Sequence, residues 1–123
     1  MYKMVICLNE EKIIEEGILN LNTIHEKLDN IFSKRGFKLS IDNNCRTYSG
    51  TGSDTDYPNL GIILNGLKKQ DWFVSNLLVW LLCANEDSDD PEVFDEEDLI
   101  EYFGFIAAYI RITLTFLYAK IIL

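Results

Sequence analysis

The sequence predicts a single α+β domain in which helices pack on one face of a small, mainly antiparallel sheet. Segments in which apolar and polar residues alternate predict strands, and amphipathic segments that begin with capping residues predict helices between them. The 123 residues are 48% hydrophobic, which supplies enough apolar surface for one core. Because no Pro-rich or Gly/Ser-rich linker interrupts the chain, we expect residues 1–123 to form one domain.

The first third of the chain is expected to contain a strand and two helices. Tyr2–Leu8 has the composition of a strand, and Asn9 with the acids that follow it can cap a short helix. A capping box formed by Thr23 and Glu26 marks the start of a second helix, and Gly36 suits the left-handed residue that ends it. The apolar face of this second helix consists of Ile24, Leu28, Ile31 and Phe32.

The middle of the chain predicts a β-hairpin followed by a loop. Phe37–Ile41 alternates apolar with polar residues, Asp42–Asn44 supplies turn residues, and Cys45–Ser49 can return as the partner strand. The polar segment Gly50–Asn59 has no regular pattern and is expected to be a loop. The apolar segment Leu60–Leu67 is interrupted by two glycines, and its secondary structure stays open.

Two further helices are expected in the second half of the chain. Asp71–Leu82 is apolar on nearly every side after its first residue, which predicts a buried helix capped by that residue. Asp95 is expected to cap the next helix, which has acids in its first turn and ends at Gly104. Phe94 would then pack onto Leu99 as a hydrophobic staple.

The C-terminal segment Phe105–Leu123 is long and apolar enough to raise the question of a membrane span. Arg111 would lie inside such a span, where it costs at least about 2.5 kcal/mol. Ile110–Phe116 alternates apolar with polar residues, which favours a strand and no association with a membrane. A membrane helix and a helix packed on the core are the alternatives.

The cysteines predict a reducing environment. Cys7, Cys45 and Cys83 are odd in number and widely separated, without the spacing of a disulfide framework. We therefore expect free thiols and a cytoplasmic location. The apolar run at the N-terminus is too short for a signal peptide and is followed at once by Asn9 and two glutamates, so secretion is not expected.

Motifs for metal, cofactor or catalytic chemistry are weak in this sequence. His25 is the only histidine, the cysteines lack zinc-site spacing, and the acidic segment lacks the glycine and the distal glutamate of a calcium loop. Ser49–Ser53 is glycine-rich, but no Lys-Ser or Lys-Thr follows it as a phosphate-binding loop requires. No local feature supports Cys45 and His25 as nucleophile and base. We therefore expect no metal, no cofactor and no enzymatic activity.

Negative charge is concentrated in one part of the chain. Half of the 20 acidic residues fall between Glu86 and Glu101, and no Lys or Arg occurs from Trp72 to Ile110. The formal net charge of -9 would repel nucleic acid and anionic membranes, which bind proteins largely through Lys and Arg. We predict a docking surface for a basic protein partner, with passive solvation of the acids as the alternative. The candidate partner-binding residues are Glu86, Asp87, Asp89, Asp90, Glu92, Glu96, Glu97 and Glu101.

The expected partner is a nuclease or another nucleic-acid-binding protein, because an acidic face can imitate the phosphates that such a protein binds. The stretch DWFVSNLLVWLLCANEDSDDPEVFDEEDLIEYF, Asp71–Phe103, resembles small acidic accessory proteins carried by mobile elements of Gram-positive bacteria, a group that includes anti-CRISPR proteins. The resemblance covers about a quarter of the chain and places an anti-CRISPR or anti-restriction inhibitor ahead of an immunity protein that neutralises a toxin nuclease. A structural or assembly protein remains the third alternative. Whether Ser53–Asp56 joins the acidic surface stays open.

Overall fold

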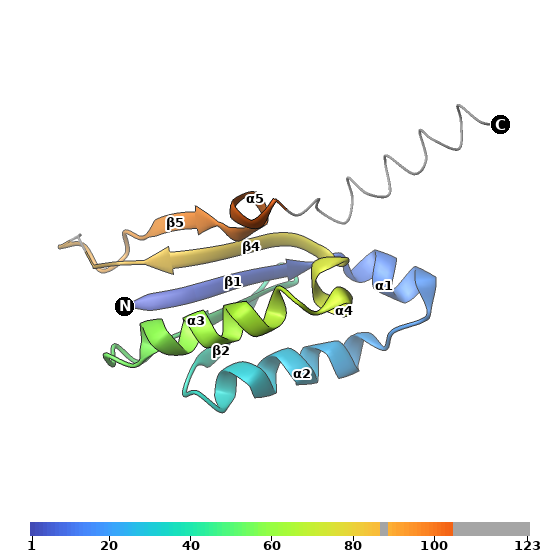
Figure 1. Ribbon diagram of the computed structural model, residues 1–123, viewed down its shortest axis with the longest axis horizontal. Helices are drawn as coiled ribbons and strands as arrows, with labels where there is room; N and C mark the ends of the chain where they lie inside the picture. Colours follow the sequence, from blue (N-terminus) through green and yellow to red (C-terminus); the bar gives the residue numbers. More distant parts are fainter. Residues whose placement is uncertain (87–88, 105–123) are drawn as a thin grey trace.

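The computed structural model describes residues 1–86 and 89–104, and these form an antiparallel sheet of five strands in the order β2-β3-β1-β4-β5 (Figure 1). β1 is the central strand and pairs with β3 on one side and β4 on the other. β2 and β5 form the two edges. The strands are β1 (Tyr2–Leu8), β2 (Lys38–Asp42), β3 (Cys45–Ser49), β4 (Leu77–Ala84) and β5 (Asp95–Asp98).

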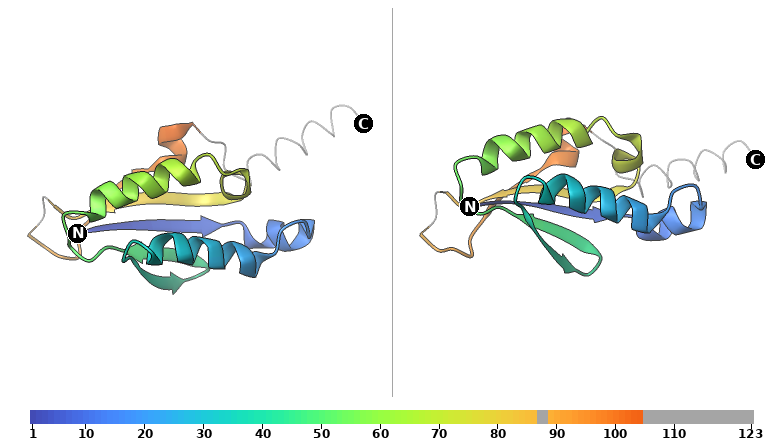
Figure 2. Two further views of the ribbon diagram at one scale, coloured as in Figure 1. Left: turned by 60° about the horizontal axis from the view of Figure 1, so that its bottom comes forward. Right: turned by 90° about the horizontal axis from the view of Figure 1, so that it is seen from below.

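Four of the five helices of the described residues lie between strands in the chain, and the fifth follows β5. The two longest, α2 and α3, lie across one face of the sheet, as both views in Figure 2 show. This arrangement confirms the predicted α+β fold with an antiparallel sheet. The helices are α1 (Glu10–Glu16), α2 (Leu21–Ser33), α3 (Asp56–Leu67), α4 (Asp71–Val74) and α5 (Leu99–Phe103).

The core lies between the sheet and α2 and α3. Ile6 of β1 is in register with Trp80 of β4, so the two side chains point to the same face, and both are fully buried. Phe32 of α2 stacks on Tyr48 of β3 with the ring centroids 3.8 Å apart. The buried residues of α2 are Ile24, Leu28 and Phe32, all from its predicted apolar face.

Several local predictions from the first half of the chain are confirmed. Tyr2–Leu8 forms β1, and Asn9 caps α1 by accepting a hydrogen bond from the Lys12 N–H at 3.2 Å. The hairpin of β2 and β3 turns at Asn43 and Asn44, which have φ angles of 49° and 65°. Two consecutive residues with positive φ are the requirement of a two-residue type I′ turn, and asparagine tolerates it well.

The starts of α2 and α3 differ from prediction. Asn20, not Thr23, caps α2, because the Asn20 side chain accepts a hydrogen bond from the Thr23 N–H at 3.1 Å. α3 begins at Asp56, inside the segment predicted to be a loop, and continues to Leu67. Pro58 fits the first turn of α3, where its missing N–H would have no partner within the helix.

The buried helix predicted over Asp71–Leu82 is wrong. Only Asp71–Val74 is helical, its cap position is Gln70, and Leu77–Ala84 forms strand β4. β4 lies between two other strands, and all its residues are buried or half-buried. Because no residue of β4 is exposed, apolar side chains occur on both faces of the strand, and the run lacks the alternation by which a strand is recognised.

The helix predicted to start at Asp95 also begins later. Asp95 is the first residue of the edge strand β5, and α5 begins at Leu99 with Asp98 as its cap. Phe94 is therefore too far from the helix start to serve as the predicted staple. Gly104 ends α5 with a φ of 70°, as predicted.

The prediction of free cysteines is wrong for two of the three. Cys7 in β1 and Cys45 in β3 are directly opposite each other, with their Cα atoms 4.3 Å apart, and form a disulfide. The pair is 38 positions apart in sequence and becomes adjacent only through strand pairing. Cys83 of β4 is a buried free cysteine, and burial, together with the Glu96 carboxylate, raises the pKa of its thiol.

Some predictions fall on residues outside the described part of the chain. These are the strand at Ile110–Phe116, the remainder of Phe105–Leu123, and the candidate residue Asp87. Within residues 1–86 and 89–104, no helix combines the length and the apolar character needed to cross a bilayer.

Candidate partner-binding surface

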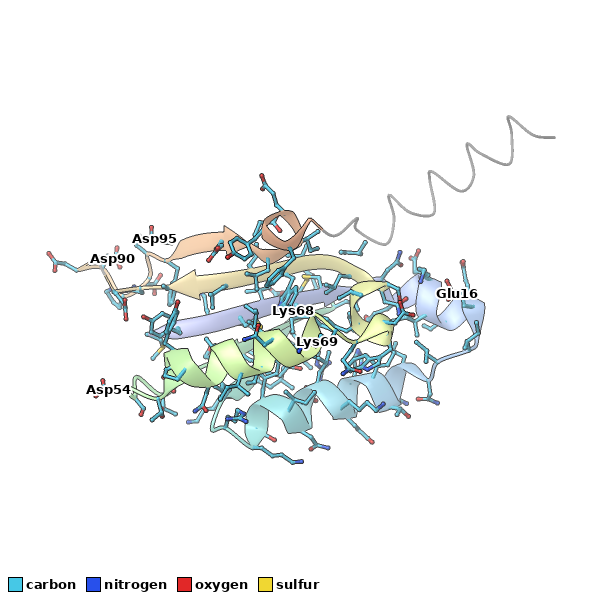
Figure 3. The ribbon with its side chains drawn as sticks, viewed as in Figure 1. Glu16, Asp54, Lys68, Lys69, Asp90 and Asp95 are labelled. Atoms are coloured by element: carbon cyan, nitrogen blue, oxygen red, sulfur yellow. A yellow bond between two sulfur atoms is a disulfide. The ribbon has the colours of Figure 1, made fainter. Side chains whose placement is uncertain are left out.

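Acidic residues from separate segments of the chain gather at one end of the molecule. Asp54 precedes α3, Glu86 follows β4, and the others lie in the loop between β4 and β5. Figure 3 shows Asp54 and Asp90 at the same end, away from α1. We call this group, which consists of Asp54, Glu86, Asp89, Asp90 and Glu92, the acidic end.

A small pocket of about 170 Å³ is lined by both Asp54 and Glu86. The Tyr2 hydroxyl donates a hydrogen bond to Oε1 of Glu86. The Tyr2 ring also contacts the ring of Tyr57, with the centroids 5.1 Å apart. The start of β1 therefore joins the first turn of α3 to the segment after β4, and Asp54 of the Ser53–Asp56 segment belongs to the acidic surface.

Asp56 has a structural role in the same region. It is 3% exposed and accepts hydrogen bonds from the Gly52 N–H at 2.8 Å and from the Thr51 hydroxyl at 3.4 Å. A Cβ atom at Gly50 would clash with the Asp56 carboxylate, so glycine is required there. Asp56 therefore holds the loop that presents Asp54 to solvent.

Hydrogen bonds within the β4–β5 loop define its path. The Asn85 side chain donates to the Asp90 carbonyl at 2.9 Å, and the Asp90 carboxylate accepts from the Glu92 N–H at 2.9 Å. The Asp90 carbonyl also accepts from the Val93 N–H at 3.2 Å. Asp90 thus shapes the loop, while Asp89 and Glu92 are exposed for contact with a partner.

Strand β5 contributes a second acidic group, the acidic edge, which consists of Asp95, Glu96, Glu97 and Asp98. All four residues are exposed. Strand alternation places Glu96 and Asp98 on one face of the sheet and Glu97 on the face that carries α3, where Glu97 is in register with Leu82. The predicted residues therefore follow an edge and the adjoining end of the molecule, and they do not share one flat face.

Asp98 connects the acidic edge to α5. Its Oδ1 atom accepts hydrogen bonds from the N–H groups of Ile100 at 3.0 Å and Glu101 at 3.2 Å. Leu99 is buried and fixes α5 against the core. The predicted residue Glu101 is exposed on this helix, so it extends the acidic edge.

The charges of Glu86, Glu92 and the acidic edge are not offset by salt bridges among the described residues, 1–86 and 89–104. Lys3 of β1 places its ammonium group 3.9 Å from the centroid of the Phe94 ring, a cation–π contact. The salt bridges of the described residues are Lys12–Glu16, His25–Glu10 and Arg46–Asp29.

The described residues include Cys45, His25 and most of the acidic side chains. They contain no group of three His, Cys, Asp or Glu side chains that could hold a metal ion. Cys45 is in the disulfide, and Nε2 of His25 lies 3.1 Å from Oε1 of Glu10. Cys45 and His25 therefore do not form a thiol and base pair.

A groove between α2 and α3 carries the opposite charge. Its volume is about 710 Å³, and no carboxylate is among the residues that line it. Trp72 lies in its wall, with the Lys27 ammonium 5.4 Å from the centroid of the indole ring. Sequence reasoning missed this groove because its two walls come from helices that the β-hairpin separates in the chain. The cationic residues of the groove are Lys27, Lys34 and Arg35.

The fold and this surface define a small α+β protein with an acidic end, an acidic edge and a groove between α2 and α3 that is lined by cations. Comparisons with protein-family models, with curated proteins and with solved structures found no match. The function is therefore inferred from the charges and contacts of the acidic end and the acidic edge.

Proposed function

We propose that the acidic end and the acidic edge form a docking surface for a cationic protein, and that the chain inhibits a basic nucleic-acid-binding protein or nuclease by occupying its nucleic-acid groove. The observation that carries this proposal is the convergence of Asp54 and Glu86 on one pocket. The two residues are far apart in sequence, so no local helix or strand requirement explains their proximity. Like charges brought together cost self-repulsion, which a cationic partner would relieve.

An array of carboxylates can take the place of phosphates in a basic groove. Lys and Arg side chains that neutralise phosphates account for much of the affinity of such grooves, and carboxylates would use the same cations. Attraction between opposite charges can raise association rates to about 10⁸ M⁻¹s⁻¹ at low salt. Because salt screens exposed charges, we expect the complex to weaken as ionic strength rises.

The setting that we favour is an anti-CRISPR or anti-restriction inhibitor of a host nuclease complex. An immunity protein that neutralises a cognate toxin nuclease has the same electrostatic requirement. The two are distinguished by genetics, because an immunity protein predicts a toxin gene immediately beside this one and protection that is lost when the toxin is absent.

We place the protein in the cytoplasm, where a host nuclease complex would be encountered. The disulfide between Cys7 and Cys45 weighs against this placement, because disulfides persist mainly in oxidising compartments. Alkylation of thiols in intact cells, followed by mass spectrometry, measures the state of the pair. A fully oxidised pair would favour a location outside the cytoplasm.

One observation favours a second role for part of the surface. β5 is an edge strand, and charged side chains on an edge strand keep it from pairing with strands of other molecules. The acidic edge therefore has a structural explanation that the acidic end lacks. We assign partner binding first to the acidic end and second to Glu96, Glu97 and Glu101.

Charge reversal with a matched control tests the docking surface. The site variant carries Asp54→Lys, Asp89→Lys and Glu92→Lys, all at exposed positions of the acidic end. The control carries Glu11→Lys, Glu15→Lys and Glu26→Lys, which are exposed on α1 and α2 and change the net charge equally.

We expect the unmodified chain to retain a basic nuclease from host lysate at low salt and to release it at about 0.5 M salt, where screening is short-ranged. The site variant should lose at least about tenfold in affinity for that nuclease, and the control should lose much less. Equal losses in the two variants would indicate a general charge effect. Inhibition that survives in the site variant would eliminate the proposed surface.

A further inference from the structure

The edge strand β2 is open to solvent along its whole length. It pairs only with β3 among the described residues, and all five of its residues are exposed. Two of them are large and apolar, with Leu39 40% exposed and Ile41 59% exposed. Figure 2 shows the β2–β3 hairpin diverging from the helix layer. An edge strand of this kind is a ready template for pairing with another strand.

The turn determines which backbone groups of β2 are available. In a two-residue hairpin the residues that flank the turn, here Asp42 and Cys45, form a hydrogen-bonded pair. The short Cα distance of 4.3 Å between Cys45 and Cys7 agrees, because it is typical of the pairs that do not exchange hydrogen bonds. The backbone groups of Asp42 therefore point to β3, and by alternation those of Leu39 and Ile41 point outward.

We propose that β2 pairs with β2 of a second copy of this chain, antiparallel, about a twofold axis that passes beside Ser40. In this register Leu39 faces Ile41 of the second copy, and the two exchange backbone hydrogen bonds on both sides of the axis. The backbone N–H and C=O groups of Leu39 and Ile41 in both copies thereby gain hydrogen-bond partners. The apolar side chains of the four residues then lie together on the face of the sheet that carries α2 and α3.

Charge selects the same register. Lys38 faces Asp42 of the second copy, and Asp42 faces Lys38, so an opposite-charge pair closes each end of the contact. Residues of β2 whose backbone groups point outward must pair with outward-pointing residues of the second copy. The pairing of the two strands can therefore shift only by two residues at a time. A shift centred on Leu39 or on Ile41 separates Lys38 from Asp42 and loses both charge pairs. The strand KLSID is therefore complementary to itself in one antiparallel register.

The dimer would extend the sheet across two copies and leave a β5 strand at each outer edge. Five residues from each chain bury little surface, so the association should be weak and readily reversible. It would nevertheless present two copies of the acidic edge and end to a partner, and two linked contacts bind more tightly than one.

Disulfide trapping of Ser40→Cys tests the proposed axis. Ser40 faces itself in a pair that does not exchange hydrogen bonds, which is the geometry of Cys7 and Cys45 within the chain. The control, Leu39→Cys, lies on the same strand but faces Ile41 of the second copy, so two identical thiols do not meet. We expect Ser40→Cys to form covalent dimers at least about tenfold faster than Leu39→Cys under mild oxidation.

Mixing two single variants extends this test. Leu39→Cys mixed with Ile41→Cys should form mixed dimers faster than either forms dimers with itself. Non-reducing electrophoresis and mass spectrometry measure the products, with the unmodified chain as the background for Cys83. Equal trapping rates for Ser40→Cys and Leu39→Cys would overturn the proposal, as would a monomer that captures a foreign strand at this edge.

Charge swaps in the Ser40→Cys background provide an independent check. Lys38→Asp places two acids opposite each other, and Asp42→Lys places two cations opposite each other, so each should slow trapping. The double swap, Lys38→Asp with Asp42→Lys, restores opposite charges and should restore the rate. Three variants that trap equally fast would contradict the register, and none of these changes touches the acidic end.

Discussion

The two edges of the sheet differ in the partner that each can accept. β5 carries only carboxylates, so every register of a β5 pair would place acids opposite acids. β2 carries Lys38 and Asp42 at its ends, and the same arrangement places opposite charges together. One edge therefore repels a copy of itself and attracts cations, whereas the other suits its own copy. The side chains of an edge strand, rather than its free backbone groups, select the partner.

The edges also differ in how firmly each is attached. β3, which supports β2, is joined to β1 by the disulfide of Cys7 and Cys45. Arg46 of β3 also donates two hydrogen bonds to Asp29 of α2, at 3.1 and 2.7 Å. β5 takes part in no disulfide or salt bridge within the described residues and is held by β4 and α5. We therefore expect β5 to open more readily than β2.

Removal of the disulfide should have the largest effect. Cys7→Ser with Cys45→Ser opens a covalent loop between positions 38 apart, for which the chain-entropy treatment gives a loss of about 4 kcal/mol in the free energy of unfolding. Urea denaturation monitored by circular dichroism measures this loss. Cys83→Ala keeps the disulfide and should lose about 1 kcal/mol. Equal losses in the two variants would show that the disulfide does not anchor the β2 side.

The hydrogen-bond network around Asp29 should have the second-largest effect on the free energy of unfolding. Partial burial disfavours the charged form of Asp29, but hydrogen bonds from Arg46 and from the Tyr48 hydroxyl outweigh burial and hold its pKa below the usual value. Burial and the Asp29 hydrogen bond also raise the pKa of Tyr48. Arg46 is 7% exposed, so loss of its carboxylate partner would leave a buried charge unpaired.

Asp29→Ala should therefore lower the free energy of unfolding by about 2 kcal/mol at neutral pH. Because the pKa of Asp29 is lower in the folded chain than in the unfolded chain, its stabilisation is complete above the unfolded value of about 3.9 and is lost as pH falls through the folded value. Chemical denaturation between about pH 2 and 7 measures this. The free energy of unfolding of Asp29→Asn should decline less steeply below about pH 4 than that of the unmodified chain. Parallel curves of stability against pH would contradict a lowered pKa of Asp29.

The cap of α5 should have the smallest effect of the three. Asp98→Ala removes the hydrogen bonds to the N–H groups of Ile100 and Glu101, which costs about 1 kcal/mol. Hydrogen exchange should become faster in β5 and α5 and stay unchanged in β2 and β3. Asp95→Ala, at the other end of the same strand, should change stability by less than about 0.5 kcal/mol. Equal acceleration of hydrogen exchange in β5 and in β2 would contradict the expectation that β5 is held less firmly than β2.

Local signals predicted much of the N-terminal half. Asn9, the asparagine turn at Asn43 and Asn44, and the left-handed Gly36 each act on a few neighbouring residues, so their effect is visible in sequence. The acidic segment of the candidate surface could also be identified from the sequence. Its division between the acidic end and the acidic edge could not. The addition of Asp54 required the contacts of β1 with two distant segments.

The sequence by itself determined an α+β domain with a hairpin that turns at Asp42–Asn44 and a concentrated negative charge, because alternation, turn residues and composition are local properties. Only the tertiary structure decided that Leu77–Ala84 is a strand, that Cys7 meets Cys45, and that Asp54 lies beside Glu86. The physical reason is common to these three cases. Each depends on pairing or packing between segments far apart in the chain, and a buried apolar run is compatible with helix or strand until its neighbours are known.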